Sequence, residues 1–305
     1  MQKIIRQTIL SIFFLSGFIP SSPAQEVKLL SQAADTLRLL QHSIILEKND
    51  SVKIHLNSKF EALLIETLKF PGAAIFPFDS INRMSRLTSP DKRFRIFNWN
   101  VPFQDGSHQY FSVIQIFHYG AQEEKVQNLT DSSKTIQDPE HKILGPDNWY
   151  GTLYYKIIPF ETTGKGTRYL LLGWHGKDTQ VTQKIIEILT IDSTSRIIFG
   201  APLFKHFADG KNTRVIFSFS ASASMALKYE DQDITTSPKW NQKKRQFESE
   251  TRNARMVVCD HLNPIDPNLS GQFQFYIPAS DQTDGFIYEN GNWVFISGVD
   301  ARNKP

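Results

Sequence analysis

Seven side chains that could bind a ligand or a metal lie in three short stretches of the sequence. They are Trp174, His175, Asp178, Asp260, His261, Asp281 and Asp284. Carboxylates and imidazoles are common metal ligands, but the spacing matches neither an EF-hand loop nor the paired histidines of a zinc protease. We therefore expect no cofactor, with Ca²⁺ at the predicted loop Asp281–Gly285 as the alternative. The seven residues are our ligand-binding candidates.

The single cysteine of the chain, Cys259, belongs to a predicted strand over 256–262. Alternation along a strand places it on the same face as Val257 and His261. A thiol nucleophile needs a base that is oriented by an acid, and it needs an oxyanion site, and the local sequence supplies neither the acid nor that site. We expect a buried, unreactive thiol, and no intramolecular disulfide can form.

Other catalytic templates are missing from the sequence. It contains no Gly-x-Ser-x-Gly motif and no glycine-rich phosphate loop, and the serines of 218–222 end a predicted strand without a base beside them. A carboxylate pair for glycoside hydrolysis stays open, because the separation of such a pair is a property of the fold. Asp260, Asp281 and Asp284 are the candidates for that chemistry. Exposed tryptophan rings could stack on sugars, but we expect most of these rings in the core.

Two amphipathic helices are predicted between residues 25 and 70. Apolar residues recur there at steps of three and four, before and after a polar break at 49–51. The second helix has Asn57 or Ser58 as its expected N-cap, with Glu61 as the capping-box partner.

The pattern changes after Pro77 to short runs rich in aromatic and β-branched residues, separated by turn formers. Asn290-Gly291, between two such runs, predicts a hairpin with a type I′ turn. The runs have no helices between them, whereas parallel pairing needs crossovers of about a dozen residues or more. The sequence predicts a mainly β fold: an antiparallel meander over 76–305, as a sandwich, an open barrel or an incomplete propeller-like stack, with the N-terminal helical pair of 25–70 packed on it.

Two polar segments interrupt the meander, at 123–148 and 231–255, and both are predicted to be long surface loops. The second is rich in lysine and arginine, but its acidic residues dilute that charge. Net charge over the whole chain is +3, from 34 Lys+Arg against 31 Asp+Glu. We therefore expect no nucleic acid and no anionic membrane as the partner.

The first 24 residues have the features of a secretory signal peptide. Two basic residues precede an apolar run over 9–19, and Ser22-Pro23-Ala24 offers small residues at the positions that a signal peptidase reads. The run is shorter than the roughly 20 residues that cross a bilayer as a helix. We expect cleavage after Ala24, no transmembrane segment after cleavage, and a mature chain over 25–305 that forms a single β-rich domain in the periplasm or outside the cell.

Five stretches carry a resemblance to other proteins: Phe94–Asn100, Trp149–Tyr155, Leu171–Gly176, Asp260–Pro264 and Asp284–Phe286. In them the chain resembles uncharacterised secreted or periplasmic proteins of Bacteroidota over most of its mature length. The resemblance implies the exported compartment and transfers no activity, ligand or site. A further triplet, Ser89-Pro90-Asp91, is similar to the turn of β-propeller blades, where the Asp bonds backbone N–H groups, but it occurs once.

These observations predict an exported envelope protein that binds or supports a partner and is not an enzyme. The expected partner is an envelope protein or a glycan. The alternative is a carboxylate-dependent hydrolase acting on envelope or environmental polysaccharide. A cleft lined by carboxylates and exposed tryptophan rings would favour the hydrolase, whereas buried rings and a filled interior would favour the binding or structural protein.

Overall fold

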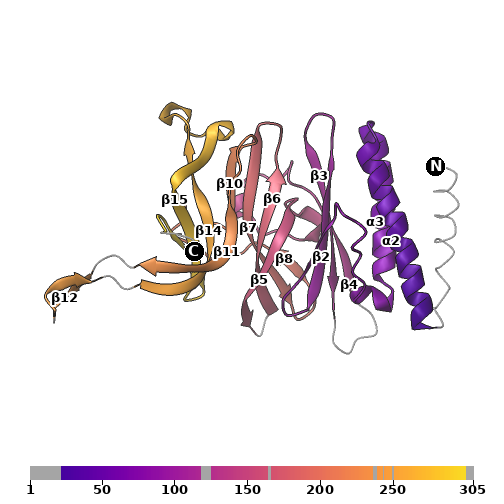
Figure 1. Ribbon diagram of the computed structural model, residues 1–305, viewed down its shortest axis with the longest axis horizontal. Coiled ribbons are helices and arrows are strands. Elements are labelled where there is room, and N and C mark those ends of the chain that lie inside the picture. Colours follow the sequence, from indigo (N-terminus) through magenta and orange to yellow (C-terminus); the bar gives the residue numbers. More distant parts are fainter. Residues whose placement is uncertain are drawn as a thin grey trace. The chain divides into compact units, whose positions relative to one another are not determined.

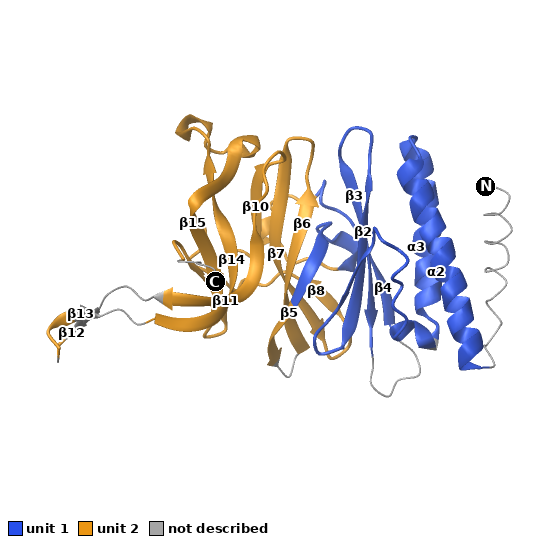
Figure 2. Cartoon of the chain, in the orientation of Figure 1, with its two compact units in different colours: residues 1–135, 146–157 blue, residues 136–145, 158–305 orange. Residues whose placement is uncertain are grey.

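The computed structural model describes residues 22–117, 125–163, 166–235, 239–242, 244–248 and 251–299. Residues 1–21, which hold most of the predicted signal peptide, lie outside them. The chain divides into two compact units: unit 1 comprises 1–135 and 146–157, and unit 2 comprises 136–145 and 158–305 (Figure 2). The single domain expected over 25–305 stays a prediction.

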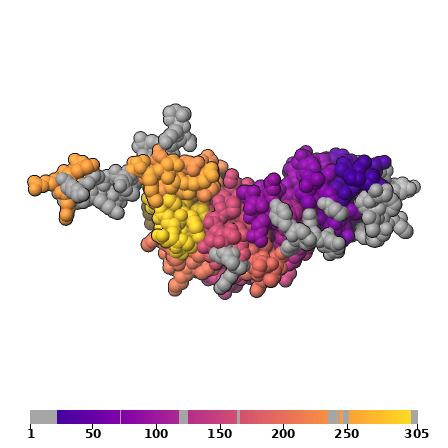
Figure 3. Space-filling view, turned by 90° about the horizontal axis from the view of Figure 1, so that it is seen from below, coloured from indigo at the N-terminus to yellow at the C-terminus, as the bar shows by residue number. Residues whose placement is uncertain are grey.

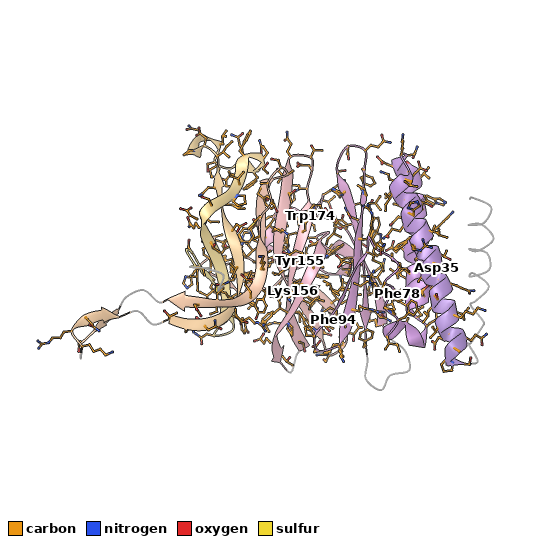
Figure 4. The ribbon with its side chains drawn as sticks, in the orientation of Figure 1. Asp35, Phe78, Phe94, Tyr155, Lys156 and Trp174 are labelled. Carbon is orange, nitrogen blue, oxygen red and sulfur yellow. The ribbon has the colours of Figure 1, made fainter. Side chains whose placement is uncertain are left out.

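The described residues of unit 1 form two long helices, two short 3-10 helices and four strands: α2 (Pro23–Leu46), α3 (Asp50–Leu68), η2 (Pro71–Ala74), η4 (Pro146–Asn148), β1 (Ser85–Thr88), β2 (Phe94–Pro102), β3 (His108–Ile116) and β4 (Lys125–Thr130). The two long helices cover one face of an antiparallel sheet with the order β1-β2-β3-β4 (Figure 1). Apolar residues of both helices and alternate residues of β2 form one core, and Phe78 lies in it between helices and sheet (Figure 4).

Within the described ranges, unit 2 contains three short 3-10 helices and most of the strands: η3 (Pro139–His141), β6 (Gly166–Gly176), β7 (Val181–Asp192), β8 (Ile197–Phe199), β9 (Phe204–Lys205), β10 (Arg214–Ser220), β11 (Leu227–Thr235), β12 (Lys239–Asn241), β13 (Gln246–Glu248), β14 (Thr251–Pro264), η5 (Pro267–Leu269), η6 (Phe273–Phe275), β15 (Tyr276–Glu289) and β16 (Asn292–Ile296). β5 (Leu153–Thr163) belongs to both units. One sheet has the order β10-β7-β6-β5, with β8 paired to β7, and the other has the order β11-β14-β15-β16-β9.

The two sheets of unit 2 share one core, as in a β-sandwich. Leu172 and Ile186 come from the first sheet, and Val257 and Phe286 come from the second. The predicted mainly β, antiparallel fold with an N-terminal helical pair is therefore confirmed. Among the pairings of the second sheet, β9 with β16 is parallel.

The predicted turn at Asn290-Gly291 joins β15 to β16, with φ of 50° and 78° at its two residues. Both angles lie in the left-handed region that a type I′ turn requires, where asparagine and glycine are the least strained residues. In the Ser89-Pro90-Asp91 turn, Asp91 Oδ1 accepts the backbone N–H of Arg93 at 3.4 Å, as expected. Ser89 Oγ accepts the backbone N–H groups of Arg93 and Phe94 at 3.0 and 3.2 Å.

The expected N-cap of the second helix is wrong. α3 begins at Asp50, because Asn49 Oδ1 accepts the backbone N–H of Val52 at 3.1 Å. Asn57 is instead buried within the helix, where its Oδ1 accepts the indole N–H of Trp99 at 2.7 Å. A polar side chain predicted to start a helix therefore joins α3 to β2.

The expectation of two long loops is also wrong. Segment 123–148 contains β4, which pairs with β3. In segment 231–255 the ladder of β11 and β14 continues as far as the pair Thr235–Thr251, and β12 pairs with β13 beyond it. The described residues of this segment are orange in Figure 3. The apolar residues of this segment are few and widely spaced, so it lacks the apolar alternation by which strands are predicted.

Arg95, a buried arginine of unit 1, is bound by neutral oxygen atoms. Its guanidinium donates to the carbonyl oxygens of Ala73 and Phe76 at 2.6 and 2.9 Å and to Gln115 Oε1 at 2.8 Å. It also lies over the Phe97 ring, 4.5 Å from the centroid. These contacts fasten the 3-10 turn η2 to the sheet.

Arg214, a buried arginine of unit 2, is bound by a carboxylate. Its Nε donates to Glu187 Oε1 at 2.6 Å, and both side chains are fully shielded from solvent. Nη1 of the same guanidinium donates to the carbonyl oxygen of Pro139. This ion pair joins neighbouring strands β10 and β7, because Arg214 lies opposite Glu187 in their register.

Candidate functional site

Three of the candidates predicted from the sequence, Trp174, His175 and Asp178, lie at the end of β6 and in the turn after it. Figure 4 labels Trp174 on this strand. The Trp174 ring is half-buried, and His175 is buried. Asp178 Oδ1 accepts the backbone N–H groups of Gln180 and Val181, each at 2.8 Å. The Asp178 carboxylate therefore closes the turn between β6 and β7.

Two other candidates, His261 and Asp284, are brought into contact by the pairing of β14 with β15. His261 Nδ1 lies 2.5 Å from Asp284 Oδ2. The second oxygen of the buried Asp284 carboxylate accepts Ser297 Oγ at 2.9 Å and the backbone N–H of Gly298 at 3.1 Å. The arrangement orients the imidazole and occupies both carboxylate oxygens.

The remaining two candidates, Asp260 and Asp281, lie on β14 and β15 in different surroundings. Asp260 lies opposite Thr283, and its Oδ2 accepts the backbone N–H of Ala226 at 2.7 Å. Asp281 is exposed on β15. The expectation that Asp281 and Asp284 share a loop is wrong, since both belong to β15, next to an irregularity in its register with β14.

Cys259 is buried, as predicted, and lies opposite Asp284 in the strand register. Burial raises the pKa of its thiol well above the ordinary value, and the negative charges of Asp284 and Asp260 raise it further. The thiolate, which is the reactive form, is therefore suppressed. The statement that no acid orients His261 is wrong, however, because Asp284 does so from the neighbouring strand.

A pocket of about 260 Å³ lies within unit 1, beside the part of β2 that extends past β1. Its walls come from four parts of the unit: Gln41, Ile44 and Ile45 of α2, Phe60 of α3, Arg83 before β1, and Trp99, Asn100, Val101, Pro102 and His108 of β2 and β3. Most of these side chains are apolar, and none is a carboxylate. Sites for small ligands have this composition, an apolar cavity with a few polar groups.

Gln41 is a polar residue at a core position of α2 and is 8% exposed. Its Oε1 accepts the backbone N–H of Arg83 at 3.1 Å. Its Nε2 is buried and has no hydrogen-bond partner among the residues that the structure describes. Leaving a buried donor unsatisfied costs about 1–3 kcal/mol.

Asn100 and His108 form a polar pair in the wall of the pocket, with Asn100 Nδ2 2.7 Å from His108 Nδ1. Because an amide nitrogen donates, the ring nitrogen accepts, and the imidazole is neutral with its proton on Nε2. Burial lowers the pKa of His108, the charge of Lys134 lowers it further, and Asp105 opposes both effects. The neutral ring therefore predominates at neutral pH.

Trp99 forms a rigid wall of the pocket. Its ring stacks on Phe111 with centroids 5.8 Å apart, and it meets the edge of Phe60 at 5.0 Å. Its N–H is held by Asn57, as described above. Lys53 of α3 donates to the carbonyl oxygen of Pro102 at 2.6 Å and joins the helix to the end of β2.

The described part of the chain contains no cluster of three or more histidine, cysteine or acidic residues arranged to hold a metal ion. None of the helices within it is long and apolar enough to cross a membrane. A scan against protein-family models, a search of curated proteins and a search of solved structures each found no match to the chain. The resemblance to exported proteins of Bacteroidota stays a prediction.

Sequence reasoning missed the pocket, although one signal for it was present. Leu37, Gln41 and Ile44 follow one another at the helical spacing of the apolar face of α2, so Gln41 is a polar residue where the pattern requires an apolar one. Arg83, Asn100 and the other polar wall residues gave no such signal, because their approach to Gln41 depends on how the helix pair packs on the sheet.

Proposed function

We propose that this protein is an exported, non-enzymatic binding protein whose small ligand occupies the pocket of unit 1. The observation that carries the proposal is the buried, unpartnered Nε2 of Gln41 in the wall of a largely apolar pocket. Native proteins satisfy most buried polar groups, so each exception calls for a physical reason. A ligand that brings an acceptor atom into the pocket would supply the missing partner.

The hydrolase alternative receives less support from the same geometry. Asp260 and Asp284, two of its three candidate carboxylates, already accept hydrogen bonds from the protein. Three tryptophan rings that could have stacked on sugar are buried: Trp99, Trp149 and Trp293. A glycan or an envelope protein, the partners predicted from the sequence, would then bind in addition to the small ligand. We propose that binding of the small ligand in the unit 1 pocket needs no cofactor.

Occupation of the pocket can be tested with a blocking variant. Ile45 lines the pocket and is 37% exposed, so Ile45→Trp fills the space without disturbing the core. Leu39→Trp is the matched control, because Leu39 is exposed on the same helix and does not line the pocket. We expect small aromatic and aliphatic fragments, screened by ligand-observed NMR, to bind the wild type and Leu39→Trp but not Ile45→Trp. Equal binding to all three proteins would refute the proposed site.

Export is a separate part of the proposal and has its own test. The pattern at 1–24 favours removal of the leader after Ala24. Mass spectrometry of the protein recovered outside the cytoplasm is expected to give a chain that begins at Gln25. A chain that stays in the cytoplasm with its first 24 residues would contradict export.

A further inference from the structure

We propose that the ligand of the unit 1 pocket is a small organic anion, a carboxylate on an apolar body, whose charge is bound by Arg83. This inference rests on the proposed function, since it names the class of ligand that the same pocket takes. It follows from three properties of the walls: their charge, their hydrogen-bond donors and their size.

The charge of the walls favours an anion. Arg83 is the one lining residue that is positively charged at all ordinary pH values, and no acidic residue lines the pocket with it. Its side chain is exposed, and the structure records no ion pair or side-chain hydrogen bond for it within the described ranges. A guanidinium binds carboxylates in a bidentate geometry that an ammonium group cannot provide.

The donors of the walls favour an acceptor group on the ligand. Gln41 Nε2 is a buried donor without a partner, and the backbone N–H of Arg83 is already bound to Gln41 Oε1. This hydrogen bond connects Gln41 directly to the residue that carries the guanidinium. A carboxylate has two oxygens with about four lone-pair sites, so it can bind the guanidinium with both oxygens and also accept from the amide.

The size and the apolar walls restrict the body of the ligand. A volume of about 260 Å³ is below the range of about 300–1,000 Å³ that is typical for drug-sized ligands. Phe60 and Trp99 are buried and held in place by aromatic contacts, so this side of the pocket is preformed. A single ring or a short alkyl chain fits these walls.

Two pairs of probes of nearly equal shape test the inference by titration calorimetry on the complete protein. The first pair is phenylacetate and phenylacetamide, and the second is octanoate and octanamide. Each amide keeps the body and the carbonyl acceptor but lacks the charge. We expect the anion of at least one pair to bind about tenfold more tightly than its amide, which is 1.4 kcal/mol.

Three variants identify the residues responsible. Arg83→Gln is expected to weaken binding of the anion about tenfold and to leave binding of the amide unchanged, whereas Gln41→Leu weakens both. Lys28→Gln is the matched control, because it removes the same charge from an exposed position of α2, about 20 Å along the helix from Gln41.

The outcomes separate this inference from the proposed function. If the amides bind as tightly as the anions, at a site that Ile45→Trp blocks, the ligand is not required to be an anion. The proposal that the pocket is the binding site would then still hold. An anion preference that survives in Arg83→Gln would overturn the role of Arg83. If neither member of either pair binds the wild type, and the fragment screen is also negative, both the ligand class and the proposed function fail.

Discussion

The pocket of unit 1 and the His261–Asp284 pair of unit 2 both contain buried polar side chains, but the pocket also contains a buried donor that has no partner among the described residues. Both oxygens of Asp284 accept hydrogen bonds from the protein itself. In the pocket, Gln41 Nε2 has none within the part of the chain that the structure describes. Our proposal therefore places the binding site at the donor that the fold leaves unsatisfied and not at the cluster of titratable residues.

The buried arginines show a second contrast between the units. Arg214 is bound by the Glu187 carboxylate, whereas Arg95 is bound by two carbonyl oxygens and the Gln115 amide. In unit 2 a single carboxylate, that of Glu187, therefore neutralises the charge of the buried arginine. In unit 1 several neutral dipoles share the stabilisation of the charge, so the loss of one of them matters less.

The largest expected effect is the difference between Glu187→Leu and Gln115→Leu. Each substitution removes the side-chain oxygen that accepts from a buried guanidinium. Glu187→Leu leaves a buried charge without its counterion and is expected to cost about 3–5 kcal/mol of the free energy of unfolding. Gln115→Leu removes a neutral acceptor and is expected to cost about 1–2 kcal/mol.

Urea unfolding monitored by circular dichroism measures both losses. The double variant Glu187→Leu with Arg214→Met is the control, because it removes both charges and is expected to recover a large part of the stability. Equal losses for the two single variants would show that the carboxylate and the neutral dipoles stabilise their arginines equally well.

A smaller effect is expected where the two carboxylates of β15 are compared. Asp284→Asn removes the charge from the hydrogen bond with His261, so we expect a loss of about 1–3 kcal/mol. Asp281→Asn changes an exposed residue and is expected to alter stability by less than about 0.5 kcal/mol. Thermal unfolding of both variants tests the comparison, and an Asp281→Asn protein that is the less stable of the two would contradict it.

The smallest expected effects concern two histidines whose pKa values shift in opposite directions. Burial lowers the pKa of His108 in unit 1, so the folded state binds its proton less readily than the unfolded chain, and this part of the stability is lost as pH falls below about 6.5. Hydrogen bonds with Asp138 and Asp209 raise the pKa of His141 in unit 2. Its contribution is present below about 6.5 and is lost as pH rises through the folded pKa.

Urea midpoints measured between about pH 5 and 8 separate the two histidines. His108→Gln is expected to reduce the loss of stability on acidification, and His141→Gln is expected to lower stability at acidic pH only. The effect of His141 is small, because its side chain is 36% exposed and solvent screens its ion pairs. A change of the same sign in both variants would contradict the opposite shifts.

The fold class could be predicted from the sequence because it depends on local periodicity. The helical spacing over 25–70 and the alternation after Pro77 are both properties of neighbouring residues, and Asn290-Gly291 specifies its turn by backbone conformation alone. The segment 231–255 was predicted to be a loop because its apolar residues are too few and too widely spaced to alternate. Only the pairing of β11 with β14 identifies it as a sheet.

The candidate sites could not be predicted in the same way, because they depend on contacts between distant residues. His261 and Asp284 are 23 positions apart, and an irregularity in the register of their strands decides which carboxylate meets the ring. Gln41 and Arg83 are 42 positions apart and meet where the helix pair packs against the sheet. For Gln41 alone, its place on an apolar helix face was a sign visible in the sequence.

If the chain is exported as we propose, the start of α2 sets the order of leader cleavage and folding. The helix begins at Pro23 with Ser22 as its cap, so the bond after Ala24 lies within the first turn. Proteases cleave opened, unfolded backbone, and Glu26, two residues further on, is held by the backbone N–H of Gly72 at 2.7 Å once the helix has docked. A leader that is cleaved after Ala24 must therefore be removed before the first turn of α2 forms. A chain that folds before cleavage is expected to keep its leader.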